Sequence, residues 1–308
     1  MTGLSQKIFD NYQVRRTKKQ KLAFIELLKN YFPDLKVEEG GFLHNRNIIV
    51  GDVDSAEIII GAHYDTCAIL PFPNFITPKN IFIYILYSIL ICIPFFLIGG
   101  LFYYLISFII NDPDVAFLLS DIFFLIILIG GLLIGIPNKH TANDNTSGVI
   151  MLCELISRLT DEEKKNVAFV FFDNEENGLF GSSYFAKVHK KGLNDKLMIN
   201  FDCISDGSNL LVVQNKNAKK EYSDLVRESF INKDNKKVYL ESSKTAFYPS
   251  DQINFPKNIA IAFLNKGKLG LYMNRIHTKR DVIFDESNIE YLFMCIKNFL
   301  CIYNKNKR

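Results

Sequence analysis

Residues 166–178 read NVAFVFFDNEENG and place two adjacent carboxylates, Glu175 and Glu176, just after a continuous apolar run. A short run rich in valine and phenylalanine that stops at a turn is typical of a strand buried on both faces, as in parallel sheets covered by helices. Adjacent carboxylates repel each other, so the pair needs an explanation. Either it is a solvated acidic turn, or one carboxylate holds a metal ion while its neighbour moves protons.

Three other apolar runs have the character of buried strands and alternate with helical patterns. They cover residues 57–65, 196–204 and 257–264. Alternating strands and helices predict an α/β fold with a mostly parallel central sheet flanked by helices. The other expected strands are 35–39, 42–50 and 209–214, and the expected helices are 5–31, 144–159, 178–190, 218–231 and 287–303.

Metal-binding side chains gather where these strands end. The carboxyl ends of parallel strands meet at one edge of a sheet, where ligands bind. The residues at these ends, and at the helix start and loop beside them, are His63, Asp65, Asp144, Glu175, Glu176, Asp202 and His277. Histidine nitrogens and carboxylate oxygens suit zinc, and a carboxylate at a helix start is well placed to bridge two ions. A nearby dication removes the repulsion between Glu175 and Glu176, so the metal interpretation explains the pair.

The segment 79–138 differs sharply in composition from the rest of the chain. Residues 81–110 contain no charged side chain, and residues 115–137 contain only Asp121. Each run reaches the roughly 20 apolar residues that cross a bilayer, whereas a buried core helix of this length keeps some polar face. We expect a two-helix transmembrane hairpin at 79–138, contacting lipid through both runs. It would be inserted in a loop of one discontinuous domain made of residues 1–78 and 139–308.

The charges around this segment predict its orientation. Lys79 and Lys139 flank its outer ends, and the turn between the helices carries Asp112 and Asp114. Lysine and arginine favour the cytoplasmic side, so we expect an integral membrane protein with a cytoplasmic catalytic domain. Because the hairpin leaves after the first motif and returns before Asp144, the metal edge should lie near the membrane face. Either substrates arrive along the inner leaflet, or the hairpin is only an anchor.

Charge and cysteine content exclude some classes of protein. A net charge of +3 gives no general case for nucleic-acid binding. The first residues lack the apolar core of a signal peptide. Six cysteines occur without a CxxC pair, which suits buried thiols in a reducing compartment better than a disulfide framework.

Five segments resemble the signature motifs of the di-zinc exopeptidases. This family includes bacterial leucine aminopeptidases and aminopeptidase S, with glutamate carboxypeptidase and the glutaminyl cyclases as relatives. The segments are IIIGAHYDT (58–66), ANDNTSG (142–148), FDNEENGLFGS (172–182), INFDCI (199–204) and IHTKRD (276–281). The resemblance extends over both soluble segments in order and implies the phosphorylase/hydrolase-like fold of zinc exopeptidases. The hairpin is the main departure from the family.

The resemblance implies a metal-binding role for five residues. His63 and Asp202 would bind one zinc ion, and Glu176 and His277 would bind the other. Asp144 would bridge the two Zn²⁺ ions. These are the matched positions of the family motifs.

The resemblance also implies catalytic and supporting roles. Glu175 would be the general base, and Asp65 would accept the second ring N–H of His63 and so determine its tautomer. Asp281 would act similarly near His277. A further segment, SDQINF (250–255), resembles a supporting family motif. Tyr248 is either a packed aromatic residue or an oxyanion donor. Cys67 and Cys203 are expected to be packed thiols, because the family motifs have no cysteine ligand.

Three functions remain open at this stage. The first is a membrane-anchored zinc aminopeptidase that cleaves N-terminal residues from peptides. The second is carboxypeptidase, amidohydrolase or glutaminyl-cyclase-like chemistry at the same site, although cyclases of this type keep one zinc and the intact His63 indicates two. The third is a non-catalytic receptor or scaffold, a class that loses ligands, whereas this chain keeps all five and the base. The sequence carries no code for the substrate side chain or the oligomeric state.

Overall fold

The four apolar runs form the centre of one sheet in the computed structural model, which describes residues 1–70, 72–130, 135–233 and 235–307. The central strands are adjacent and parallel, in the order β4 (Val167–Phe172), β3 (Ile58–His63), β5 (Leu197–Phe201) and β8 (Asn258–Gly267). Every residue of β3, β4 and β5 is buried. The predicted α/β fold with a central sheet is therefore confirmed.

The edges of this sheet are antiparallel to its centre at both junctions. The full order is β1-β2-β4-β3-β5-β8-β6-β7, and β9 pairs with β8. The edge strands are β1 (Lys36–Gly40), β2 (Asn45–Val50), β6 (Asn209–Gln214), β7 (Lys237–Ser242) and β9 (Gly270–Tyr272). Strand β2 is antiparallel to β4, and β6 is antiparallel to β8. The sheet is thus mixed, and its parallel centre carries the predicted site. Strand β7 has an apolar run of only three residues between polar ones, so its sequence pattern did not reveal it.

Helices cover both faces of the sheet. The helices of the body are α1 (Gly3–Asn11), α2 (Lys18–Tyr31), α5 (Gly148–Arg158), α6 (Asp161–Lys164), α7 (Phe180–Val188), α8 (Lys216–Ser229) and α9 (Glu286–Asn306). Ile58 and Ile60 of β3 pack in the cluster that α1, α2, α5, α8 and α9 share. Ile59 between them packs with Phe185 of α7 in the opposite cluster. Successive side chains of a strand point to opposite faces, so each buried strand joins two layers of core.

The predicted single helix 5–31 is wrong, because the chain breaks between α1 and α2. Thr17 caps α2, and a reciprocal capping box with Gln20 fixes the new start. Just before it, Arg15 is fully buried and donates to the carbonyl oxygen of Tyr64 and the hydroxyl of Thr146. A basic residue in a charged segment therefore turns inward, which helical periodicity did not show.

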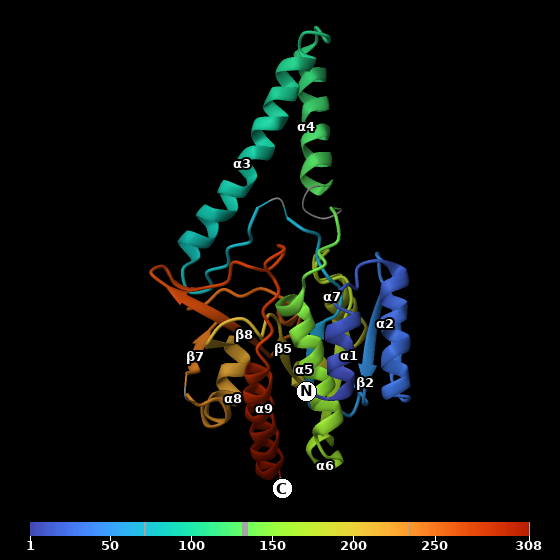
Figure 1. Cartoon of the computed structure of the whole chain (residues 1–308), viewed down its shortest axis with the longest axis vertical. Helices are drawn as coiled ribbons and strands as arrows, with labels where there is room; N and C mark the ends of the chain where they lie inside the picture. Colours follow the sequence, from blue (N-terminus) through green and yellow to red (C-terminus); the bar gives the residue numbers. More distant parts are fainter. Residues whose placement is uncertain (71, 131–134, 234, 308) are drawn as a thin grey trace.

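Two apolar helices, α3 (Ile81–Ile106) and α4 (Pro113–Ile129), project together from the body (Figure 1). They pack through aromatic rings, with the centroids of Phe102 and Phe123 4.1 Å apart. The Ser120 hydroxyl also donates to the carbonyl oxygen of Gly99 at 2.9 Å. Within the described residues, α3 is the one helix long and apolar enough to cross a membrane, a criterion of length and composition only.

The helix bounds differ from the predicted runs. Helix α3 ends at Ile106 rather than at residue 110, and α4 begins earlier than expected, at Pro113, because Asp112 caps it. Proline at the first helical position suits this start, since its missing N–H has no partner there in any case. Residues 131–134 of the second predicted run lie outside the described residues.

Candidate metal centre

The carboxyl ends of the central strands bring all five predicted metal ligands into one cavity of about 130 Å³. His63 is the last residue of β3, Glu176 follows β4, and Asp202 follows β5 directly. Asp144 lies in an irregular helical turn, η2 (Ala142–Ser147), before α5, and His277 lies in the loop after β9. Five segments distant in sequence therefore meet at one sheet edge.

Asp144 stands between the two histidines. Its Oδ1 atom is 3.3 Å from Nε2 of His63, and its Oδ2 atom is 2.9 Å from Nε2 of His277. His277 Nε2 is also 3.2 Å from Oε2 of Glu176, and His63 Nε2 is 3.9 Å from Oδ1 of Asp202. The ligand atoms form two groups that share Asp144.

Asp65 holds the loop that carries the two glutamates. Its carboxylate accepts the backbone N–H groups of Glu175 at 2.9 Å and Glu176 at 3.3 Å. The Nδ1 atom of His63 lies 3.1 Å from the carbonyl oxygen of Asp65 and 3.6 Å from its carboxylate. The sequence assigned the histidine contact to the carboxylate, whereas the carbonyl oxygen is the nearer partner.

Asp281 positions the central bridging residue. Its carboxylate accepts the backbone N–H of Asn143 at 2.8 Å and that of Asp144 at 3.0 Å. Asp281 therefore supports Asp144 more directly than His277, the residue near which the sequence placed it. Burial, reinforced by the nearby charge of Asp144, raises the pKa of Asp281 to about 8.

Three residues around the site have left-handed backbone conformations. Asn174 has φ of 54°, Cys203 of 59° and His277 of 58°. Residues with side chains rarely adopt positive φ, and such positions concentrate at functional sites. Each of the three is a site residue or directly adjoins one, so the backbone turns sharply where it must present a side chain to the cavity.

The site buries more negative charge than its histidines balance. Burial raises the pKa of Glu175 well above its ordinary value, although the charge of His63 opposes this shift. Burial also raises the pKa of Glu176, whose Oε1 atom has no hydrogen-bond partner. Asp251 is fully buried with both carboxylate oxygens unpartnered, and burial raises its pKa to about 7. Unpaired buried carboxylates are costly, and a bound dication compensates them.

The donor set fits zinc. Several sets of three ligand atoms lie within 4.8 Å of one another, among them the sets His63–Glu175–Asp202 and His63–Asp144–Glu176. Imidazole nitrogen and carboxylate oxygen are ordinary zinc ligands, and the unpartnered oxygen of Glu176 is available for one. The predicted ligands would hold two ions, with Asp144 between them.

Several cavity residues lay outside the predicted ligand set. Behind the cavity wall, the buried Ser250 donates from Oγ to Oε1 of Glu175 at 3.4 Å, and it belongs to the supporting segment identified in the sequence. Tyr84, from the first turn of α3, and Ile76, from the segment before it, also line the cavity. Neither had a sequence signal, because both lie in apolar stretches. Tyr248 lines the cavity too, but its hydroxyl donates to the carbonyl oxygen of Asp202 at 3.2 Å, as a packed residue would.

The sequence matches the model of peptidase family M28 over residues 132–294. No curated protein sequence matches the chain. Among solved structures, a Zn-dependent exopeptidase from Parabacteroides distasonis is 15% identical, with a TM-score of 0.57 over 96% of this chain and 94% of its own. Glutaminyl cyclase from Porphyromonas gingivalis is 15% identical, with a TM-score of 0.56 over 97% and 96%. The LapA aminopeptidase of Legionella pneumophila is 14% identical, with a TM-score of 0.54 over 97% and 67%. At these identities, the structural likeness establishes the fold.

Chelation should destabilise the protein, because metal ions relieve the carboxylate repulsion. At a free metal concentration 100 times the Kd, binding stabilises the folded state by about 2.7 kcal/mol. We expect a chelator to lower the thermal unfolding temperature in detergent by several degrees and added zinc to restore it. His277→Ala should lose most of this response, and His189→Ala, which pairs with Glu38 outside the site, should keep it. A wild-type unfolding temperature that is insensitive to chelation would contradict the metal centre.

Proposed function

The chain belongs to peptidase family M28, whose model covers more than half of it, and we propose that it is a membrane-anchored zinc aminopeptidase. The predicted class, a zinc metallo-exopeptidase, agrees with the family and with the fold of the Zn-dependent exopeptidase. Three finer points belong to the proposal: the substrate has a free amino terminus, the site residues have the roles given above, and the hairpin anchors the protein in a membrane. The cavity supports the first two, and the hairpin supports the third.

The charge of the cavity supports an aminopeptidase over a carboxypeptidase. The described residues that line it include four carboxylates and two histidines but no lysine or arginine. A substrate carboxylate would need a lysine or arginine side chain in addition to the metal ions, whereas an amino terminus needs only oxygen acceptors, which the cavity supplies. This observation carries the proposal that peptides enter with their free amino terminus.

The chain's own groups would move the protons of the reaction. Glu175, with its raised pKa, would take a proton from the attacking water and return it to the nitrogen of the leaving peptide. Asp65 holds the backbone of Glu175, and the hydroxyl of Ser250 orients its carboxylate. Zinc ions held by the five ligands would polarise the scissile carbonyl and make the water more acidic.

Glu175→Gln should abolish most turnover while keeping the metal. Loss of a general base costs about 100-fold to 10,000-fold in rate. The purified wild-type protein and the variant would each be incubated with peptides that have free or blocked amino termini. The products would be identified by mass spectrometry. Wild type should release single N-terminal residues from free peptides only. Glu39→Gln, an exposed glutamate outside the site, is the matched control.

The same experiment separates the other functions. A cyclase would remove ammonia from peptides beginning with glutamine and release no amino acid. A carboxypeptidase would cleave peptides with blocked amino termini from the other end. A receptor or scaffold would leave every peptide intact with both metal ions bound. Each of these results would replace the aminopeptidase proposal.

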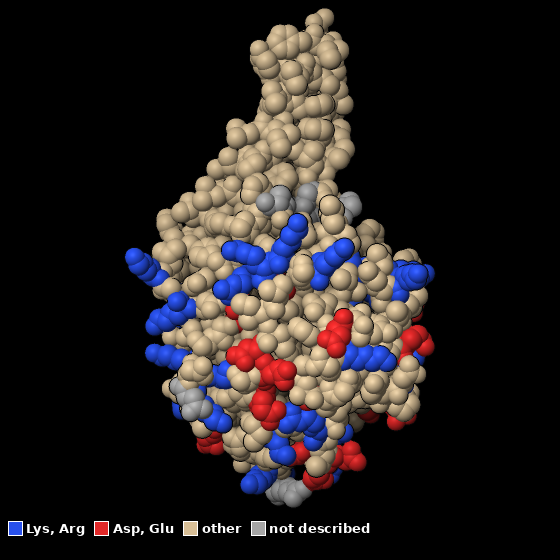
Figure 2. Space-filling view, in the orientation of Figure 1, with Lys and Arg blue, Asp and Glu red and all other residues tan. Residues whose placement is uncertain are grey.

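The hairpin supports a membrane anchor with the body on the cytoplasmic side. Most hydrophobic side chains of α3 are exposed, as a lipid-facing surface would require. On the face shown in Figure 2, the hairpin surface carries no charge, and lysine and arginine side chains gather at the end of the body nearest to it. Basic residues at this position favour the cytoplasmic side of a bilayer.

Cysteine labelling in intact cells tests this orientation. Asn111→Cys, at the exposed turn between the helices, should react with a membrane-impermeant maleimide added outside. Asn306→Cys, near the exposed end of α9, should react only after lysis. The wild-type protein, labelled in the same way, gives the background from the native cysteines. The reverse pattern would place the body outside the cell. Labelling of both positions in intact cells would show that the body is not inside the cell, and this would contradict the cytoplasmic orientation.

The hairpin is also proposed to shape the substrate cavity. Tyr84 of α3 lines it, and its ring lies 5.7 Å from that of Phe247, next to Tyr248. The segment before α3 is held to the body by a bridge between Ile76 and Met273. At about 130 Å³, the cavity is smaller than the roughly 300 Å³ at the lower end of small-molecule sites. We therefore expect a preference for small N-terminal residues.

Tyr84→Ala should widen this preference. Removing the ring opens the wall, so kcat/KM for peptides beginning with leucine or phenylalanine should rise at least about tenfold relative to alanine peptides. Phe82→Ala is the matched control, because this side chain on the same turn is 72% exposed. An unchanged ratio in Tyr84→Ala would leave the hairpin as an anchor only.

A further inference from the structure

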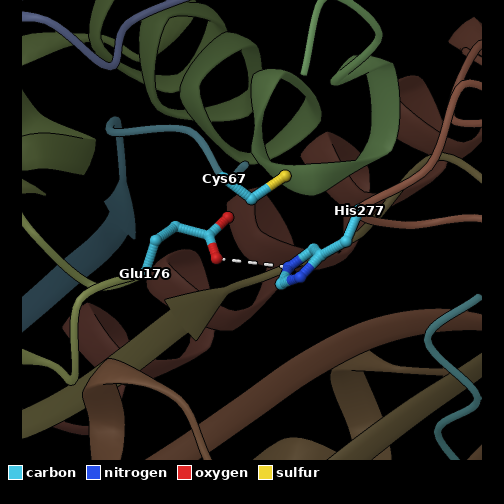
Figure 3. A group of neighbouring side chains, drawn as sticks. All are labelled: Cys67, Glu176 and His277. Atoms are coloured by element: carbon cyan, nitrogen blue, oxygen red, sulfur yellow. Dashed lines mark ion pairs between the residues drawn. The ribbon is translucent and has the colours of Figure 1, made fainter. Parts of the chain in front are cut away.

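Cys67 lies beside two of the proposed metal ligands. Its Sγ atom, a carboxylate oxygen of Glu176 and a ring nitrogen of His277 all lie within 4.8 Å of one another. Figure 3 shows the three side chains arranged around a common space. The sulfur lies above the imidazole in this view, and one carboxylate oxygen of Glu176 is directed toward the imidazole. Cys67 is 3% exposed, so this thiol faces the cluster and not solvent.

The unpartnered oxygen that supports the metal centre belongs to this same group of side chains. The Glu176 side chain is 7% exposed, and its Oε2 atom pairs with His277. The Oε1 atom is buried and has no partner. Buried acceptors in folded proteins are nearly always satisfied, so this oxygen lacks a ligand that the neighbouring thiol and imidazole could share.

A second cysteine, Cys203, also lies within 4.8 Å of carboxylate oxygens, those of Asp144 and Asp202. It packs with Leu211 and Val213 as well, and its set contains no histidine. Cys67 lies beside both a histidine and an unpartnered carboxylate oxygen. The Nδ2 atom of Asn138 lies 3.9 Å from Cys67 Sγ and donates to the carbonyl oxygens of His140 and Thr278. The thiolate is the form that binds metal, and a cation at this position would stabilise it.

We propose that Cys67 Sγ is a ligand of the metal ion held by Glu176 and His277, an inference that rests on the proposed metal centre. When the sulfur–metal bond forms, the thiol proton leaves to solvent. This ion would then have sulfur, nitrogen and oxygen ligands, with Asp144 as the oxygen shared with its neighbour. The ion near His63 and Asp202 would have only nitrogen and oxygen ligands.

A thiolate makes the two metal positions unequal. Sulfur is a soft ligand that selects zinc over manganese or magnesium, which prefer oxygen. The position with Cys67 should therefore retain zinc more tightly and exchange it less readily. Cys67 also lies where the chain leaves the body for the hairpin, and its carbonyl oxygen accepts the N–H of Asn138 on the returning segment. A metal bound to Cys67 would tie the base of the hairpin to the site.

X-ray absorption at the zinc edge tests this ligand directly in the full-length wild-type protein in detergent. Zinc–sulfur bonds are about 2.3 Å long and zinc–nitrogen or zinc–oxygen bonds about 2.0–2.2 Å, so a sulfur neighbour is resolved from the others. We expect an average of one sulfur neighbour for every two zinc ions, because only one of the two ions would bind Cys67. A spectrum with nitrogen and oxygen neighbours only, at full zinc occupancy, would overturn the proposal whether or not the enzyme is active.

Two matched variants assign the sulfur. Cys67→Ser should lose the sulfur neighbour and weaken zinc binding at one position, by at least the roughly 10- to 100-fold that loss of an outer hydrogen-bond partner costs. Cys203→Ser should keep both. Cobalt-substituted protein gives a second readout, because the sulfur-to-cobalt charge-transfer band should vanish in Cys67→Ser alone. Loss of the sulfur signal in Cys203→Ser instead would overturn the assignment. Bound sulfur-ligated zinc without peptide cleavage would refute the proposed function and leave this inference standing.

Discussion

Buried negative charge at one edge of a parallel sheet is the constraint on which the rest of the structure depends. Asp144 reaches both histidines, and Glu175 and Glu176 lie beside them in the same cavity. Carboxylates so close together repel, and two dications are the simplest compensation. The fold brings these side chains together, because each sits at a strand end or on a loop held by backbone hydrogen bonds.

Two acidic residues supply that rigidity without being ligands. Asp65 accepts two backbone N–H groups of the glutamate loop, and Asp281 accepts two at the turn of Asp144. Carboxylates used in this way orient neighbouring ligands. The left-handed residues Asn174, Cys203 and His277 perform the corresponding task in the backbone. Several buried polar groups of the site therefore hold the backbone in position rather than bind a metal ion.

The hairpin is joined to the body at the site and not at a remote loop. The chain leaves just after Asp65 and returns just before Asp144, and on the way it places Cys67 beside the ligands and Tyr84 in the cavity wall. An insertion at this position therefore contributes side chains to the cavity as well as two exposed apolar helices.

Much of the fold and of the site could be predicted from local pattern. The apolar runs predicted the four parallel central strands, and the residues that follow them include the side chains that meet in the cavity. Where local pattern failed, a tertiary contact was the cause. The predicted helix 5–31 breaks because Arg15 bonds the carbonyl oxygen of Tyr64, more than 40 residues away. The edge strand β7 forms by pairing with β6, although its apolar run is only three residues long.

The sequence by itself determined which chemistry is possible here, because ligand types, their order along the chain and the length of the apolar segments are local properties. Only the tertiary structure decided which atoms meet. It placed the carbonyl oxygen of Asp65, and not its carboxylate, nearest to His63. It also brought Cys67 to Glu176 and His277, and Tyr84 of the apolar hairpin to the cavity. These contacts join residues far apart in the chain, and distances between such residues depend on how the sheet, the loops and the hairpin pack together.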